Sequence, residues 1–359
     1  MIILEMILQR QTDQENMRMS RQNIIKAIGA CILAGFLLVS PRSAVSGSTT
    51  LKIATLAPEG SVWIQTFEDL NAELKQKTDN AVQLRIYPGG ILGDEKDMIR
   101  KMYIGQIQGA VLTSAGLSGI FGEMDVFQIP FLFQTYHEVD YVLGKMDAFF
   151  KKGFEDKGYV LAAWSEGGFV RLMSTVPIAS MDDLRKAKVW TWEDAPMAKA
   201  IFDEAGVSAI PLSLPDVLVG LQTGLVDVVY APPSGAIALQ WFTKTKYMTD
   251  VPLIYLVGGI LLKKNEVEKL APAHRQVLME LCPKYMDKLK LAIRKENQEA
   301  IQVMVKHGVK IIHPSEDQIE GFKKVSEKAM IRQTGKSFSK KVRDEVIAYL
   351  QEFRKAKGE

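Results

Sequence analysis

Strand-like and helical segments alternate along this chain, and that alternation limits the folds open to it. Residues 51–56 form a short run rich in β-forming residues, and residues 62–77 carry apolar side chains at helical spacing. Residues 82–87 alternate as a strand does, residues 94–104 favour a helix, and residues 109–113 favour a buried strand. This rhythm predicts a parallel α/β architecture.

The second half of the chain repeats the rhythm with a different sequence. Its predicted strands are residues 159–164, 169–174, 188–192 and 226–230, and its predicted helices are residues 195–205, 214–223, 272–307 and the tail after Ser315. Pro283 inside the long helix predicts a kink. Single cores stop growing near about 250–300 residues. We therefore expect the 359 residues to form two α/β lobes that are connected more than once.

The N-terminal residues have the features of a secretory leader. Basic residues without acidic neighbours occupy residues 18–26, an apolar run follows at residues 27–39, and residues 44–46 offer small side chains for cleavage. The run is shorter than the about 20 residues of a bilayer span. We predict a signal peptide over residues 1–46, with extra residues before the true start, and export to the periplasm. An uncleaved anchor is the alternative.

Composition excludes several classes of protein. Lys and Arg number 45 against 42 Asp and Glu, and the resulting net charge of +3 is too weak to indicate a nucleic-acid binder. Only Cys31 and Cys282 are present, which excludes a disulfide framework and a thiolate metal cage. We expect Cys282 to pack inside a helix.

The sequence contains no familiar catalytic or nucleotide-binding motif. It lacks GxGxxG, a P-loop, GxSxG and HExxH. The histidines are scattered, and none lies at ligand spacing from another: they are His137, His274, His307 and His313. We therefore expect no metal, no cofactor and no enzyme activity. A hydrolase, the alternative, requires a nucleophile and a base together in the cleft.

Aromatic and polar residues follow several predicted strands, where open α/β sheets bind their ligands. The candidate ligand-binding residues are Pro58, Trp63, Thr113, Ser114, Trp164, Glu166, Phe169, Arg171, Trp190, Trp192, Pro211, Tyr230 and Pro232. Their pattern favours a cleft that captures a solute and closes by lobe motion.

Four segments carry a resemblance to a known family. They are residues 88–95 (PGGILGDE), 129–133 (IPFLF), 178–185 (IASMDDLR) and 221–227 (LQTGLVD). In this order, over nearly the whole mature chain, they resemble the DctP-type solute-binding proteins of TRAP transporters. The 129–133 segment is the most specific of them.

The resemblance implies a two-lobed periplasmic binding protein of the type II fold, with a hinge and a long bridging helix at residues 272–307. Lobe I would comprise residues 47–167 and about 256–297. Lobe II, with the C-terminal helices, would comprise residues 168–255 and about 298–359. The protein would be a monomer, would bind no nucleic acid, and would deliver its solute to small and large membrane subunits that are driven by an ion gradient.

Departures from the family pattern bear on the ligand. Where the resemblance would place a carboxylate-binding arginine, this chain has Trp190. Arg171 is offset by one residue from a second family arginine, which on a strand turns its side chain to the opposite face unless a bulge intervenes. A carboxylate buried without arginine loses several kcal/mol. We predict an apolar or aromatic pocket for a hydrophobic or amphipathic ligand.

Two other interpretations stay open. In the first, Trp190 and Trp192 fill core space, and Arg171 with backbone amides holds an organic acid such as a C4-dicarboxylate. In the second, the chain is a sensory binding protein without a role in transport.

Overall fold

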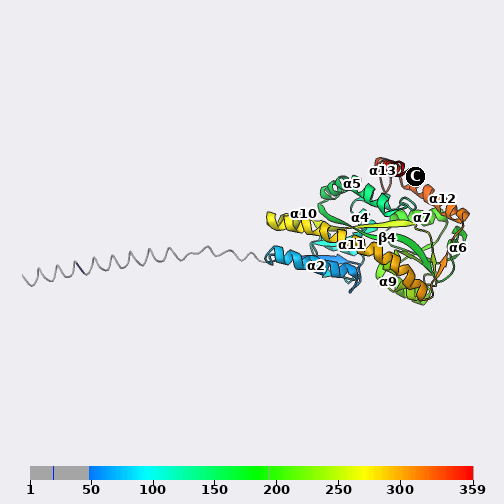
Figure 1. Cartoon of the computed structure of the whole chain (residues 1–359), viewed down its shortest axis with the longest axis horizontal. Coiled ribbons are helices and arrows are strands. Elements are labelled where there is room, and N and C mark those ends of the chain that lie inside the picture. Colours follow the sequence, from blue (N-terminus) through cyan, green and yellow to red (C-terminus); the bar gives the residue numbers. More distant parts are fainter. Residues whose placement is uncertain (1–18, 20–47, 194, 359) are drawn as a thin grey trace, which may run out of the picture. The chain divides into compact units, whose positions relative to one another are not determined.

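A mixed sheet of ten strands forms the centre of the fold (Figure 1). The computed structural model describes Met19, residues 48–193 and residues 195–358. The strands are β1 (Thr49–Thr55), β2 (Val82–Tyr87), β3 (Gly109–Thr113), β4 (Tyr159–Ser174), β5 (Val189–Thr191), β6 (Ala209–Pro211), β7 (Val228–Ala231), β8 (Tyr247–Thr249), β9 (Ile254–Lys263) and β10 (Lys310–Ile312). They follow the order β2-β1-β3-β9-β4-β7-β5-β6, and β8 and β10 extend the sheet beside β4. Apart from Met19, the predicted signal peptide lies outside the described residues.

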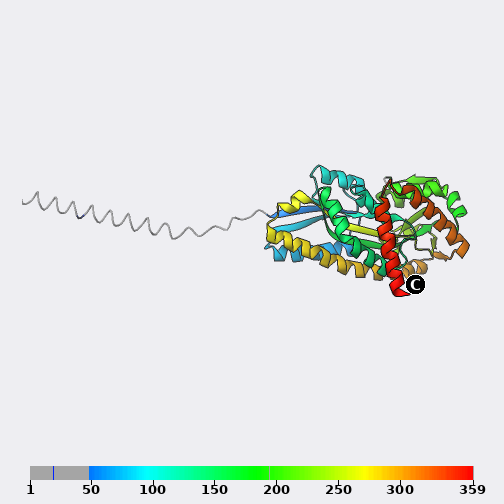
Figure 2. The same ribbon diagram turned by 90° about the horizontal axis from the view of Figure 1, so that it is seen from above.

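Helices cover both faces of this sheet (Figures 1 and 2). They are α2 (Val62–Lys77), α3 (Glu95–Tyr103), α4 (Ser114–Ser118), α5 (Tyr136–Asp156), α6 (Met181–Lys186), α7 (Pro196–Ala205), α8 (Val217–Thr223), α9 (Pro233–Ala238), α10 (Lys264–Glu268), α11 (Pro272–Lys306), α12 (Glu316–Gln333) and α13 (Lys340–Lys357), with 3-10 turns η1 (Gly122–Gln128), η2 (Leu214–Asp216) and η3 (Trp241–Thr243). The predicted α/β class is confirmed. In the described part of the chain, no helix has both the length and the hydropathy that crossing a bilayer requires.

β4 is one strand of 16 residues where the sequence predicted two. Its residues 159–170 pair antiparallel with β9, and its last residues pair with β7 and β8, so β4 belongs to both halves of the sheet. The register shifts between Glu166 and Gly168. Gly168 has φ of +100°, and a Cβ there would lie 2.4 Å from Nδ2 of Asn297, so only glycine fits this bulge.

The antiparallel strand β9 was not predicted from the sequence. Its residues, IYLVGGILLK, form a continuous apolar run, which is typical of a buried strand but does not by itself distinguish one from a helix. β9 lies between β3 and β4 and is antiparallel to both. The predicted parallel arrangement therefore holds for the outer strands β1-β2, β1-β3, β5-β6 and β5-β7, and not for the centre.

Four clusters of buried apolar side chains form the cores of the two lobes. In the first lobe, Ile53 packs with α2 and α11, whereas the next residue, Ala54, packs with residues of α5 on the opposite face. In the second lobe, Val228 and Val229 are divided in the same way between two clusters. Side chains alternate across a strand, so each half of the sheet is covered on both faces.

The long helix α11 bridges the two halves of the sheet (Figure 2). It has 35 residues, continues through Pro283, and contacts α2, β4 and α9. Cys282 lies buried in it as predicted, and burial raises the pKa of its thiol to about 12. α5, in contrast, was not predicted, although its capping box of Thr135 and Glu138 is a sequence signal.

Candidate ligand-binding site

A cavity of about 220 Å³ lies at the carboxyl ends of β1, β3 and β7, where the two halves of the sheet meet. The central strands β4 and β9 form its floor, and α11 contributes Ile293 and Glu296 from the side. Ligand pockets are mostly apolar with a few placed polar groups. This cavity fits that description, because Leu, Ile, Val, Ala, Pro and Trp side chains make up most of its wall.

Eight of the thirteen candidate residues line this cavity. They are Pro58, Trp63, Thr113, Ser114, Glu166, Trp192, Tyr230 and Pro232. They come from β1, α2, β3, β4, β5 and β7 or from the residues that follow these strands. The fold therefore brings together residues that are as much as about 170 positions apart in the sequence.

The other five candidates do not line the cavity. Trp164 donates to Asp147 at 2.8 Å and packs against Phe127 and Phe150 inside the first lobe. Phe169 packs against Tyr136 and Tyr255.

Arg171 and Pro211 lie further away. Val170 lines the cavity, and Arg171 points to the other side of the strand, where its Nε lies 3.4 Å from Asp250. The bulge at residues 166–168 leaves this alternation intact. Pro211 is exposed on the edge strand β6.

Trp190 lies behind the cavity wall. It is fully buried, and its Nε1 donates to the carbonyl of Leu212 at 3.0 Å. Its ring lies 4.9 Å from that of Trp192 and 4.8 Å from that of Tyr230, centroid to centroid. The expectation that Trp190 lines the pocket is not met. Its ring instead packs against Trp192, Tyr230 and Trp241, which do line it.

Glu95 is an acidic group in the cavity wall that sequence analysis did not select. It begins α3, is buried, and accepts hydrogen bonds from the Thr113 amide at 2.5 Å and the Thr113 hydroxyl at 2.7 Å. Burial raises its pKa to about 7, against the lowering effect of these bonds. A Cβ on Gly116 would lie 2.7 Å from the carboxylate, so glycine there makes room for Glu95. The carboxyl can therefore be protonated near neutral pH and donate a hydrogen bond.

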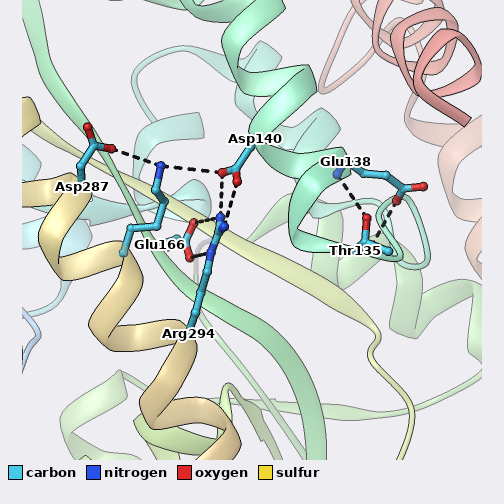
Figure 3. Close-up of polar contacts among 7 residues, drawn as sticks. Thr135, Glu138, Asp140, Glu166, Asp287 and Arg294 are labelled. Carbon is cyan, nitrogen blue, oxygen red and sulfur yellow. Dashed lines mark hydrogen bonds and ion pairs between the residues drawn. The ribbon is translucent and has the colours of Figure 1, made fainter. Parts of the chain in front are cut away.

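The cation beside the cavity is already neutralised (Figure 3). Arg294 of α11 binds both oxygens of Glu166 at 2.7 and 2.9 Å, and both oxygens of Asp140 of α5 at 2.8 and 2.7 Å. Two bidentate pairs use the donor capacity of a guanidinium almost completely. Arg294 is not part of the cavity wall, and it has little capacity left for a ligand.

Three polar atoms of wall residues are buried without a hydrogen-bond partner in the described part of the chain. They are the Ser165 hydroxyl, the indole N–H of Trp192 and the Tyr230 hydroxyl. A buried polar group without a partner is costly. A ligand in this cavity can supply the missing partners, by accepting from Trp192 and by exchanging a hydrogen bond with Ser165.

No positive charge faces the cavity. Among the described residues that line it, none is Lys, Arg or His, whereas Glu95, Glu166 and Glu296 are acidic. The described residues also hold no group of three His, Cys, Asp or Glu side chains that could bind a metal. Among the described residues of the wall, none of the serines has a histidine beside it.

Sequence analysis also missed the lining residues of β9 and α7. β9 contributes Ile254, Leu256, Val257 and Gly258, and α7 contributes Ala198 and Ile201. These residues could not be selected because β9 itself was not predicted, and because periodicity does not show which face of α7 meets the cavity.

Comparison with known proteins places the chain among solute-binding receptors. The family described as bacterial extracellular solute-binding protein, family 7, matches residues 53–336. The 2,3-diketo-L-gulonate-binding periplasmic protein YiaO of Escherichia coli is 26% identical over 286 residues, which are 79% of this chain and 86% of that protein. The C4-dicarboxylate-binding periplasmic protein DctP of Rhodobacter capsulatus is 24% identical over 245 residues, 67% of this chain and 73% of that protein.

Solved structures show the same fold. The sugar acid binding protein of Advenella mimigardefordensis, in complex with galactonate, superposes with a TM-score of 0.80 at 18% identity, covering 85% of this chain and 99% of that one. The two-lobed architecture expected from the resemblance is therefore confirmed.

Proposed function

Because the chain belongs to the bacterial extracellular solute-binding proteins of family 7, we propose that it captures a hydrophobic or amphipathic small molecule and delivers it to the membrane subunits of a TRAP-type transporter. The family consists of receptors and not of enzymes. We further propose that the cavity between the lobes, with the boundaries expected from the sequence, is where the solute binds.

The absence of a positive charge from the described cavity wall carries the proposal about the ligand. A carboxylate in this cavity would face Glu95, Glu166 and Glu296, and Arg294 is engaged by Glu166 and Asp140. Desolvating an unpaired carboxylate costs several kcal/mol. An apolar or neutral amphipathic molecule avoids that cost and gains about 25 cal/mol per Å² of apolar surface that it buries.

An organic acid is the second candidate, and the names of the relatives favour it. The Escherichia coli and Rhodobacter capsulatus proteins are named for 2,3-diketo-L-gulonate and C4-dicarboxylates, and the Advenella mimigardefordensis protein was solved with galactonate. All three ligands are carboxylates. To bind one here, the chain would have to bring Arg171 into the cavity from its position beside Asp250.

Thermal-shift screening tests the choice between these ligands. A ligand at a hundredfold excess over its Kd stabilises by about 2.7 kcal/mol, which corresponds to several degrees in Tm. We expect neutral apolar and amphipathic compounds to raise Tm, and succinate and galactonate to leave it unchanged. Arg171→Ala should respond to the compounds as the wild type does. Stabilisation by an organic acid that Arg171→Ala abolishes would overturn the proposal.

Transport and sensing require a different experiment. We expect the proteins that co-purify with the receptor from solubilised membranes to include a small and a large TRAP subunit. Recovery of a sensor kinase instead would favour the sensory role.

A further inference from the structure

A second hollow lies directly behind the cavity wall. It has a volume of about 80 Å³ and is formed by β4, α7, α12 and the segment around Phe131. Its wall is apolar except for the hydroxyls of Tyr230 and Ser326, and the Ser326 hydroxyl donates to the carbonyl of Pro130 at 2.9 Å. A water molecule needs two to four polar partners, and these two hydroxyls are all that the wall offers, so the hollow favours an apolar occupant. We call it the rear chamber.

The wall between the cavity and the rear chamber is one side chain thick. The same five residues line both spaces: Val170, Ala198, Ile201, Tyr230 and Ile254. The hollow is partly open, as the cavity is, so it is not a sealed void in the core. Its five wall residues shared with the cavity distinguish it from an isolated surface depression. Rotation of aliphatic side chains such as Val170 or Ile201 would join the two spaces.

The backbone at the rear chamber is strained. Phe131 has φ of +61°, a conformation that bulky residues rarely adopt, and its amide donates to the carbonyl of Leu253 at 2.6 Å. Both residues line the chamber. Strain of this kind persists where the surrounding structure enforces it, and it is concentrated at functional sites.

We propose that the rear chamber receives the tail of an elongated amphiphile whose neutral head group lies in the cavity. This inference rests on the proposed function and extends it from an apolar ligand to a linear one with an alkyl chain. The head would accept a hydrogen bond from Trp192 and exchange one with Ser165, whose polar atoms are otherwise unpartnered. The tail would pass between Val170, Ile201 and Tyr230 into the chamber.

Primary n-alkanols from butanol to decanol test this inference by calorimetric titration of the exported chain. Their hydroxyl can donate and accept, and each buried methylene should tighten binding about fourfold. We expect affinity to rise with chain length beyond the member that fills the cavity, and to reach a plateau when the rear chamber is full.

Two variants should move that plateau in opposite directions. Ala205 and Phe322 are buried and line the rear chamber but not the cavity. Ala205→Leu fills the chamber and should end the rise at a shorter alkanol, whereas Phe322→Leu enlarges it and should extend the rise. Phe154→Leu is the matched control, because Phe154 is fully buried in another cluster and should leave the plateau unchanged.

The outcomes separate this inference from the proposed function. If short alkanols bind but affinity stops rising at the same length in all variants, the rear chamber takes no tail and the inference fails alone. If no alkanol binds, the inference fails, and binding of succinate or galactonate would then show that the proposed ligand class is wrong as well. If Ala205→Leu does not fold, Phe322→Leu decides alone. A plateau reached at a longer alkanol than in the wild type supports the inference, and a plateau at the same alkanol overturns it.

Discussion

Replacing Arg294 by methionine removes the cation that neutralises Glu166 inside the fold. Arg294 lies on α11, Glu166 lies on β4 at the bulge between the two halves of the sheet, and Asp140 lies on α5 (Figure 3). Methionine keeps much of the aliphatic length of arginine, so the change removes four charge-assisted hydrogen bonds with little loss of packing. The guanidinium also lies 4.6 Å from the ring centroid of Tyr136.

The expected cost follows from the exposure of the three side chains. Glu166 is 4% exposed and Arg294 15% exposed, whereas Asp140 is 41% exposed. Breaking a buried pair from one side typically costs about 3–5 kcal/mol, and an exposed pair contributes about 1 kcal/mol or less. We therefore expect Arg294→Met to lower the free energy of unfolding by about 3–5 kcal/mol, nearly all of it through Glu166. Glu166→Gln, which leaves Arg294 paired with Asp140, should cost only about 1–3 kcal/mol.

Urea unfolding followed by circular dichroism measures both effects and their coupling. The double variant Arg294→Met/Glu166→Gln should be no less stable than Arg294→Met alone, because its glutamine carries no charge that would be left buried and unpaired. Lys290→Met is the matched control, since Lys290 lies one turn earlier on α11 and approaches the same Asp140 only at 3.8 Å. It should cost less than about 1 kcal/mol. The reasoning is refuted if Arg294→Met costs no more than Lys290→Met, or if the two changes simply add.

Two further predictions concern polar groups in the cavity wall. The pKa of Glu95 is raised to about 7 in the folded protein, so Glu95 ionises first in the unfolded chain as pH rises. The free energy of unfolding should therefore fall between about pH 4.5 and 7, by up to about 3 kcal/mol. Glu95→Gln should lose this part of the pH dependence in urea titrations, and an identical pH profile for both proteins would contradict the prediction. The buried Ser165 hydroxyl has no partner in the described structure. Ser165→Ala should therefore leave the stability of the ligand-free protein unchanged or raise its free energy of unfolding by about 1–3 kcal/mol, and it should weaken ligand binding in calorimetry. A less stable variant with unchanged affinity would show that the hydroxyl has a structural role instead.

Local patterns in the sequence were sufficient to predict the first lobe's outer elements. The bounds of α2, β2 and β3 agree with those expected, because amphipathic periodicity and the flanking Gly, Pro and Ser residues are local signals. β9 and the continuity of β4 depend on pairing between residues about 100 positions apart. No local pattern reports such pairing, so β9 was missed and β4 was predicted as two separate strands.

The candidate site divides in the same way. Residues directly after strands, such as Pro58, Ser114 and Pro232, could be selected because the carboxyl ends of the strands converge. Trp190 and Trp192 share a strand face, but Trp190 precedes the strand end and packs beneath Tyr230. Arg171 is turned outward by alternation next to Val170. The neutralisation of Arg294 by two carboxylates depends on three distant elements and could be seen only in the structure.

Native mass spectrometry of the protein purified from the periplasm, without added ligand, tests the nature of the solute most directly. The absence of a cation from the described cavity wall predicts a retained apolar or amphipathic molecule that carries no carboxylate. It also predicts that the molecule is lost when the protein is unfolded and refolded. A retained sugar acid or dicarboxylate would contradict the account, because this cavity wall offers such a ligand no positive charge.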